Sequence, residues 1–67
     1  MINWQFSDTQ WTVLNMSAFG WTDREIASEL GMSPKTVVTH RHRMLRRSGA
    51  ATWAQLLYEA GREKVFG

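Results

Sequence analysis

Residues 22–45, TDREIASELGMSPKTVVTHRHRML, decide the fold, because they contain two helix-forming stretches separated by a short turn. Thr22 is suited to N-cap the first stretch, and Glu25, three residues later, can complete a capping box. Gly31 favours the left-handed conformation that ends a helix, and the Ser-Pro pair two residues later supplies an N-cap and a first helical residue. This pattern is typical of a helix-turn-helix.

The rest of the chain predicts one further helix on each side of this segment. The first helix begins with a capping box of Ser7 and Gln10 and ends near Gly20, and the fourth begins at Thr52 with Gln55 as its box partner. No stretch alternates apolar and polar residues as a strand does. We therefore expect one all-α domain over residues 1–67, with helices at about 7–19, 22–30, 34–47 and 52–61.

Length and composition narrow the class of protein. A chain of 67 residues buries only about 60% of its unfolded surface, and without cysteine it has neither disulfides nor thiolate metal sites. The leading MINWQFSD is no export signal, and no apolar run is long enough to cross a bilayer. We expect a cytoplasmic, nucleoid-associated protein with no membrane partner. Met1 and this lead favour a complete small protein over the excised C-terminal domain of a longer one.

The net charge of +2 is unevenly distributed. Residues 1–30 hold four acidic residues and one arginine, whereas residues 31–48 hold five basic residues and no acid. A run of charge is often only a solvated helix face, but such faces usually mix signs. An all-basic helix favours a polyanion as partner.

The predicted third helix has two distinct sides, since successive residues are about 100° apart. The side expected to face the body of the domain carries Val37, His40, Arg41, Met44 and Ser48. The opposite side carries Lys35, Thr39, His42 and Arg46, flanked by Val38 and Arg43. A helix in a major groove presents such a side to base edges and phosphates. The N-terminal N–H groups, with Ser33 and Thr36 beside them, offer a further phosphate site.

Other kinds of site are poorly supported. His40 and His42 point about 200° apart on a helix and cannot bind one metal ion, so we expect His40 to be packed and hydrogen-bonded across the domain. Glu25 and Glu29 share a face, but the first is committed to a cap and the second to solvent. No Gly-rich phosphate loop or nucleophile motif is present. We expect no enzymatic activity, cofactor, metal or small-molecule ligand.

The run from Phe6 to Ala60 resembles the LuxR-type (GerE-like) helix-turn-helix domain of bacterial transcription regulators, here as a stand-alone domain. The matching residues are Gly20, Glu25, Ile26, Ala27, Leu30, Gly31, Ser33, Lys35, Thr36, Val37, Thr39, His40, Arg41, Arg43, Leu45, Arg47 and Gly49. The resemblance implies four helices, of which the third enters the major groove and the fourth pairs with a second copy.

The resemblance and the helix faces together assign roles to individual residues. We expect bases to be contacted by Val38, Thr39 and His42. We expect phosphates to be contacted by Ser33, Lys35, Thr36, Arg43, Arg46 and Arg47. We expect dimerisation through the apolar stripe of the fourth helix, Trp53, Leu56, Leu57 and Ala60.

Several residues depart from the family pattern. Family members often carry Lys at the position of Val38, so the recognised DNA sequence does not follow by analogy. Ser17 and Ser48 stand where large aliphatic side chains are usual. Either the tryptophans refill the core, or these serines lie at a rim that another chain covers. The tryptophans are Trp4, Trp11, Trp21 and Trp53.

Two functions follow from these observations. The first is a homodimeric, sequence-specific transcription regulator that binds double-stranded DNA. The second is a small interaction module that pairs with a larger regulator or with RNA polymerase and modulates DNA binding. In the second case the basic face would be present but dispensable.

Overall fold

The structure, a computed structural model, describes residues 2–63 and consists of four helices. The helices are α1 (Asp8–Ala18), α2 (Asp23–Leu30), α3 (Pro34–Ser48) and α4 (Trp53–Arg62). The prediction of an all-α fold with four helices is confirmed, and residues 2–63 contain no strand. Both predicted ends of the domain, residues 1 and 67, lie outside the described residues.

Two predicted capping boxes are present and define where α1 and α2 begin. Ser7 Oγ accepts from the Gln10 N–H at 3.2 Å, and Gln10 Oε1 accepts from the Ser7 N–H at 3.2 Å. The corresponding distances between Thr22 and Glu25 are 3.2 Å and 2.8 Å. The bond from the Thr22 N–H, and then that from its hydroxyl, lower the pKa of Glu25 below its usual value. The Glu25 carboxylate is therefore stabilised in its charged form.

The start and the end of α4 differ from the prediction. Thr52 Oγ1 accepts from the Gln55 N–H at 3.0 Å, but Gln55 Oε1 accepts from the N–H of Ala51, at 2.8 Å, instead of that of Thr52. The φ of Thr52 is −140°, against −77° at Thr22, so the backbone at this cap differs from that at a cap where the box is complete. At the other end, α4 continues through Gly61, because the N–H of Glu63 still donates to Glu59 at 2.9 Å.

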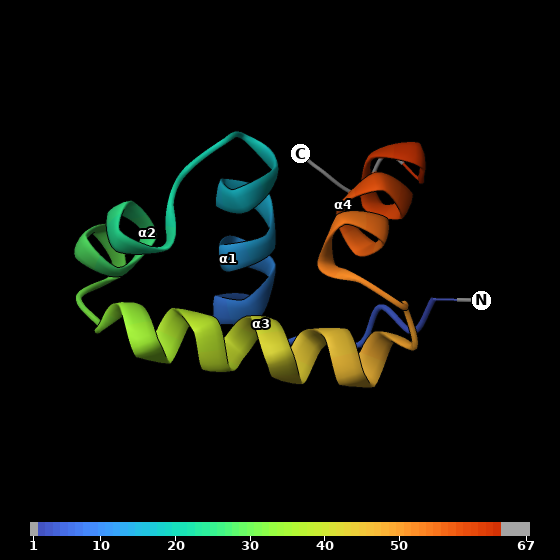
Figure 1. Cartoon of the computed structure of the whole chain (residues 1–67), viewed down its shortest axis with the longest axis horizontal. Coiled ribbons are helices and arrows are strands. Elements are labelled where there is room, and N and C mark those ends of the chain that lie inside the picture. The colour runs from blue at the N-terminus through green and yellow to red at the C-terminus, as the bar shows by residue number, and fades with distance from the viewer. Residues whose placement is uncertain (1, 64–67) are drawn as a thin grey trace.

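The helices are arranged around α1, which stands on α3 with α2 on one side and α4 on the other (Figure 1). The turn between α2 and α3 depends on Gly31, which adopts the left-handed conformation at φ 68°. Ser33 then N-caps α3, and Pro34 is its first residue, as predicted. In consequence α3 lies along one edge of the domain, with its outer side uncovered (Figure 1).

The core consists of two clusters, and α1 contributes one fully buried residue to each. Val13 packs in the first cluster, whose other buried members are Ile26, Ala27 and Val37. Leu14 packs in the second, whose other buried members are Met44, Leu56 and Ala60. The apolar residues therefore surround much of α1 because it is buried against neighbours on both sides.

Three of the four tryptophans help to fill the second cluster. Trp4 stacks on Trp11 with ring centroids 6.0 Å apart, and Trp53 also packs there. Trp21 does not, because it is 42% exposed outside both clusters. Ser48 is buried, and its hydroxyl donates to the carbonyl of Leu45 at 2.8 Å and accepts from the Ala50 N–H at 3.1 Å.

Two features are absent from the part of the chain between residues 2 and 63. None of the four helices combines the length and the apolar character needed to cross a membrane. Nor do three or more His, Asp or Glu side chains come together there in a way that could hold a metal ion.

The cap of α2 should contribute to stability. Replacement of Thr22 by Ala removes the oxygen that accepts from the Glu25 N–H, so we expect a loss of about 1 kcal/mol in the free energy of unfolding. Urea denaturation followed by far-UV circular dichroism measures it. Thr9→Ala is the control, because Thr9 is exposed in the first turn of α1 but is not its cap. Equal stability of both variants would contradict the role of the cap.

Candidate nucleic-acid interface

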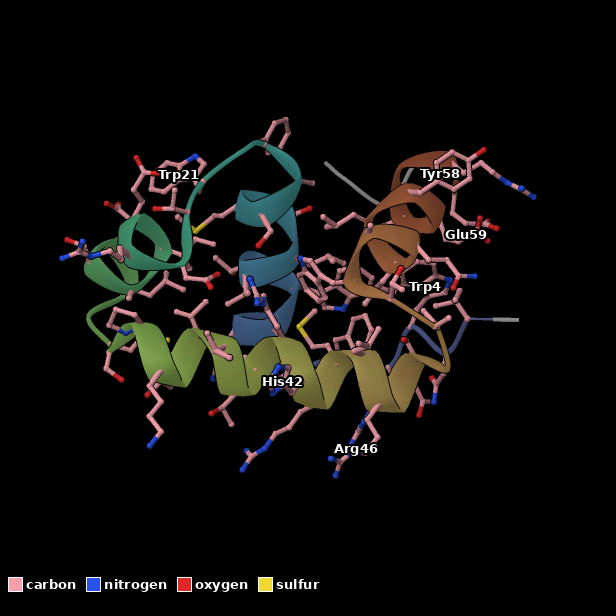
Figure 2. All side chains as sticks on the ribbon, viewed as in Figure 1. Trp4, Trp21, His42, Arg46, Tyr58 and Glu59 are labelled. Atoms are coloured by element: carbon pink, nitrogen blue, oxygen red, sulfur yellow. The ribbon has the colours of Figure 1, made fainter. Side chains whose placement is uncertain are left out.

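The outer side of α3 is the candidate interface. α3 turns Val37, Met44 and Ser48 into the domain, where they are buried. On the opposite side Lys35, Thr39, His42 and Arg46 are all exposed. Figure 2 shows Arg46 extending away from the other three helices. With 15 residues, α3 is about 22 Å long, which suits a helix lying in a groove about 12 Å wide.

The three residues predicted to contact bases differ in what they offer. Thr39 is exposed, but its hydroxyl donates to the Lys35 carbonyl at 3.0 Å, so it presents a methyl group and an acceptor oxygen. His42 is exposed and lies near the middle of α3 (Figure 2). Val38 is half-buried at the flank, and only part of its apolar surface is accessible. The structure therefore brings these three side chains to neighbouring positions on one helix.

The polar groups at the start of α3 form some of their hydrogen bonds with each other. Ser33 Oγ accepts from the Thr36 N–H at 3.2 Å and lies 2.9 Å from Thr36 Oγ1. Because the two hydroxyls share one hydrogen bond, one O–H proton stays available to an anion. Lys35 is exposed beside them. The N-terminal end of α3 therefore retains a donor, and its contact with a phosphate stays a prediction.

The last turns of α3 carry three exposed arginines, Arg43, Arg46 and Arg47. Arg47 also contacts the segment before α1, because its Nη1 donates to the carbonyl of Gln5 at 3.3 Å. The described ion pairs between residues 2 and 63 involve other arginines. The positive charge of these last turns is therefore not neutralised by a described acidic partner.

Arg41 lies on the other side of α3 and has a different role. Its Nη1 donates to both carboxylate oxygens of Asp23, at 2.9 Å and 3.0 Å, and its guanidinium is 5.7 Å from the centroid of the Trp53 ring. From its position in α3, Arg41 thus contacts both the start of α2 and the start of α4. Sequence reasoning placed Arg41 on the inner side but missed both contacts, although it was the one basic residue of the helix assigned there.

The prediction for His40 is not confirmed. Its Nδ1 is buried without a hydrogen-bond partner among the described residues, as are Asn15 Oδ1 and Arg41 Nε. The expected bond across the domain is therefore not made at that nitrogen. His40 is half-buried, whereas His42 is exposed.

Only two of the four residues predicted to mediate dimerisation have accessible surface. Leu56 and Ala60 are fully buried in the chain's own second cluster and have no surface left for a partner. Trp53 and Leu57 are half-buried, so part of each side chain is accessible. The nearby Tyr58 is 65% exposed and points outward (Figure 2). The sequence pattern identified an apolar side of α4 without distinguishing its core-facing half from its accessible half.

Comparison with known proteins identifies the family of the chain. The sequence model for bacterial regulatory proteins of the luxR family (GerE) matches residues 5–60. This span includes α1, α2 and α3 and most of α4. Neither a curated protein nor a solved structure matches the chain.

The contact between Arg41 and Asp23 should be measurable as a coupling between the two side chains. They are 30% and 28% exposed, so we expect a modest coupling free energy of about 1 kcal/mol in a double-mutant cycle with Asp23→Asn and Arg41→Gln. Asp8→Asn is a matched control, because Asp8 occupies the same first position of α1 and pairs with no described arginine. Additive effects of Asp23→Asn and Arg41→Gln would contradict the pairing.

Proposed function

The chain belongs to the luxR family of bacterial regulatory proteins, and on that basis we propose that it is a sequence-specific transcription regulator that binds double-stranded DNA with α3 in the major groove. One observation carries this proposal: the outer side of α3 is exposed, polar and basic from end to end, whereas the remaining basic residue of the helix, Arg41, is paired inside. A regulator of this kind acts at the nucleoid, in the cytoplasm.

In the proposed complex, phosphate contacts at the two ends of α3 fix its position. Lys35 and Arg46 are about 16 Å apart along the helix axis at about 1.5 Å per residue, which exceeds the groove width of about 12 Å. Contacts near Ser33 and Thr36 at one end, and at the arginines at the other, would therefore reach phosphates on the two walls of the groove.

Between these ends, three side chains face the bases. Val38 has no hydrogen-bonding group, so it makes an apolar contact with a thymine methyl. Thr39 offers its methyl group and, with its proton donated to the helix, an acceptor for an amino group of a base. His42 donates or accepts, depending on its tautomer. The half-site should therefore include a thymine opposite Val38.

We also propose that the protein acts as a homodimer through α4. The accessible parts of Trp53 and Leu57, with the exposed Tyr58, form an apolar surface that a second copy can cover. A two-fold dimer places its recognition helices in successive major grooves, about 34 Å apart. The bound sequence should then be an approximate palindrome.

Selection of bound duplexes from a random pool tests the function. We expect the parent protein to enrich an approximate palindrome, and Val38→Lys to shift the preference toward guanine at one position of each half-site. Ala18→Lys is the control, because it adds the same charge at an exposed position at the end of α1, remote from the outer side of α3. The control should enrich the parental sequence.

The same experiment can contradict the proposal. Identical enriched sequences for the parent, Val38→Lys and His42→Ala would show that these side chains do not contact bases. Failure of the parent to enrich any sequence, together with binding to a larger regulator or to RNA polymerase, would favour the interaction module.

Sedimentation equilibrium tests the dimer. We expect the parent to self-associate and Leu57→Asp to weaken that association, because the change places a charge on the accessible surface of α4. Leu30→Asp is the matched control: Leu30 is likewise half-buried beside a core cluster, but it belongs to α2. A parent that stays monomeric with and without DNA would contradict the homodimer.

A further inference from the structure

An open hollow of about 450 Å³ lies between the first turn of α1 and the last turns of α3. It is lined by Gln10, Arg43, Arg46 and Arg47. In Figure 1, α1 begins close against α3, which brings its N-terminal end to this place. Sequence reasoning treated the three arginines as separate contacts and assigned Gln10 only to a cap. The fold joins all four residues in one site.

The arginines of the hollow form no ion pair with a described acidic residue. Arg43 is one helical turn from both Arg46 and Arg47, and like charges at this spacing repel each other. Among residues 2–63 no acidic residue lines the hollow, and Asp8, two residues before Gln10, is not part of its wall. Three guanidinium groups around one opening are best satisfied by a shared anion.

The donors in this hollow are also held in position. Gln10 Oε1 accepts from the Ser7 N–H, so the Nε2 amide group is the part of that side chain left to donate to an anion. The Gln5 carbonyl accepts from Arg47 Nη1 and steadies its guanidinium. The positive end of the α1 helix dipole lies in the same region. Each guanidinium can bind an oxyanion through two parallel N–H groups.

We propose that this hollow binds a phosphate group. In the DNA complex the group is a backbone phosphate beside the turns where α3 leaves the major groove, and this part of the inference rests on the proposed function. Arg46 connects the two surfaces, because it lies both on the outer side of α3 and in the wall of the hollow. Gln10 of α1 thereby becomes a contact residue outside the helix-turn-helix.

Gln10→Glu is the decisive variant, because it adds a negative charge to the hollow while keeping the oxygen that completes the capping box. We expect the thermal stability to be retained and the affinity for the selected DNA to fall about threefold to tenfold. The slope of the logarithm of the binding constant against the logarithm of the salt concentration should become shallower by about 1. Thr9→Glu is the matched control, since it adds the same charge to the same helical turn outside the hollow. It should change the affinity much less.

Two further measurements identify the source of the phosphate. One follows the Gln10 side-chain amide and arginine Nε–H signals by NMR during titration with inorganic phosphate, for the parent and for Gln10→Glu. The other replaces each DNA phosphate in turn by a neutral methylphosphonate. We expect one position at which the replacement weakens binding of the parent but has little effect on Gln10→Glu.

The results distinguish a backbone phosphate, a free phosphate and the absence of a phosphate site. Coupling at one DNA position supports a backbone phosphate, whereas saturable, Gln10-dependent shifts without such coupling support a free phosphate. If Gln10→Glu and Thr9→Glu bind DNA equally well and phosphate causes no saturable shift, the phosphate site is overturned while the DNA-binding function stands. If the parent selects no DNA but binds phosphate in the hollow, the proposed function fails and the site remains.

Discussion

The structure depends on the burial of two neighbouring residues of α1, Val13 and Leu14, in two different core clusters. Full burial of such side chains contributes about 1.5–3 kcal/mol each. Through Val13, α1 holds α2 and the first half of α3, and through Leu14 it holds α4 and the second half. α3 is thus fixed near both ends from one side only. Its outer side stays exposed because α1, α2 and α4 all lie on the other side of α3 (Figure 1).

The same packing separates two kinds of basic residue on one helix. Arg41 points inward and is satisfied by Asp23 and the ring of Trp53, so its charge stabilises the arrangement of α2, α3 and α4. Arg43, Arg46 and Arg47 are exposed and have no described acidic partner. A charge satisfied within the fold is not available to DNA, whereas unsatisfied charges attract phosphates and release counterions when they bind them. Position around the helix therefore decides the role of each arginine.

The segment before α1 belongs to this arrangement. Its Asn3 N–H donates to the carbonyl of Ser48 at 3.0 Å, and its Trp4 and Phe6 pack in the second cluster. The two rings contact each other edge to face, with centroids 6.2 Å apart. The same segment reaches Arg47 through the Gln5 carbonyl. A stretch without regular structure thereby supports both the core and the proposed phosphate site.

The sequence by itself determined most features whose partners lie within about four residues, because local geometry sets those bonds; the bond that Gln55 accepts at the start of α4 is the exception. These include the caps at Ser7, Thr22 and Ser33, the turn at Gly31, and the polar outer side of α3, which follows from helical periodicity. Only the tertiary structure decided which apolar residues of α4 face the core, where Trp21 lies, and which arginine meets Asp23. These three features depend on how the helices cross and interdigitate. The hollow between Gln10 and the arginines of α3 also depends on that packing. Their partners are distant in the chain, and their positions follow from packing rather than from any local pattern.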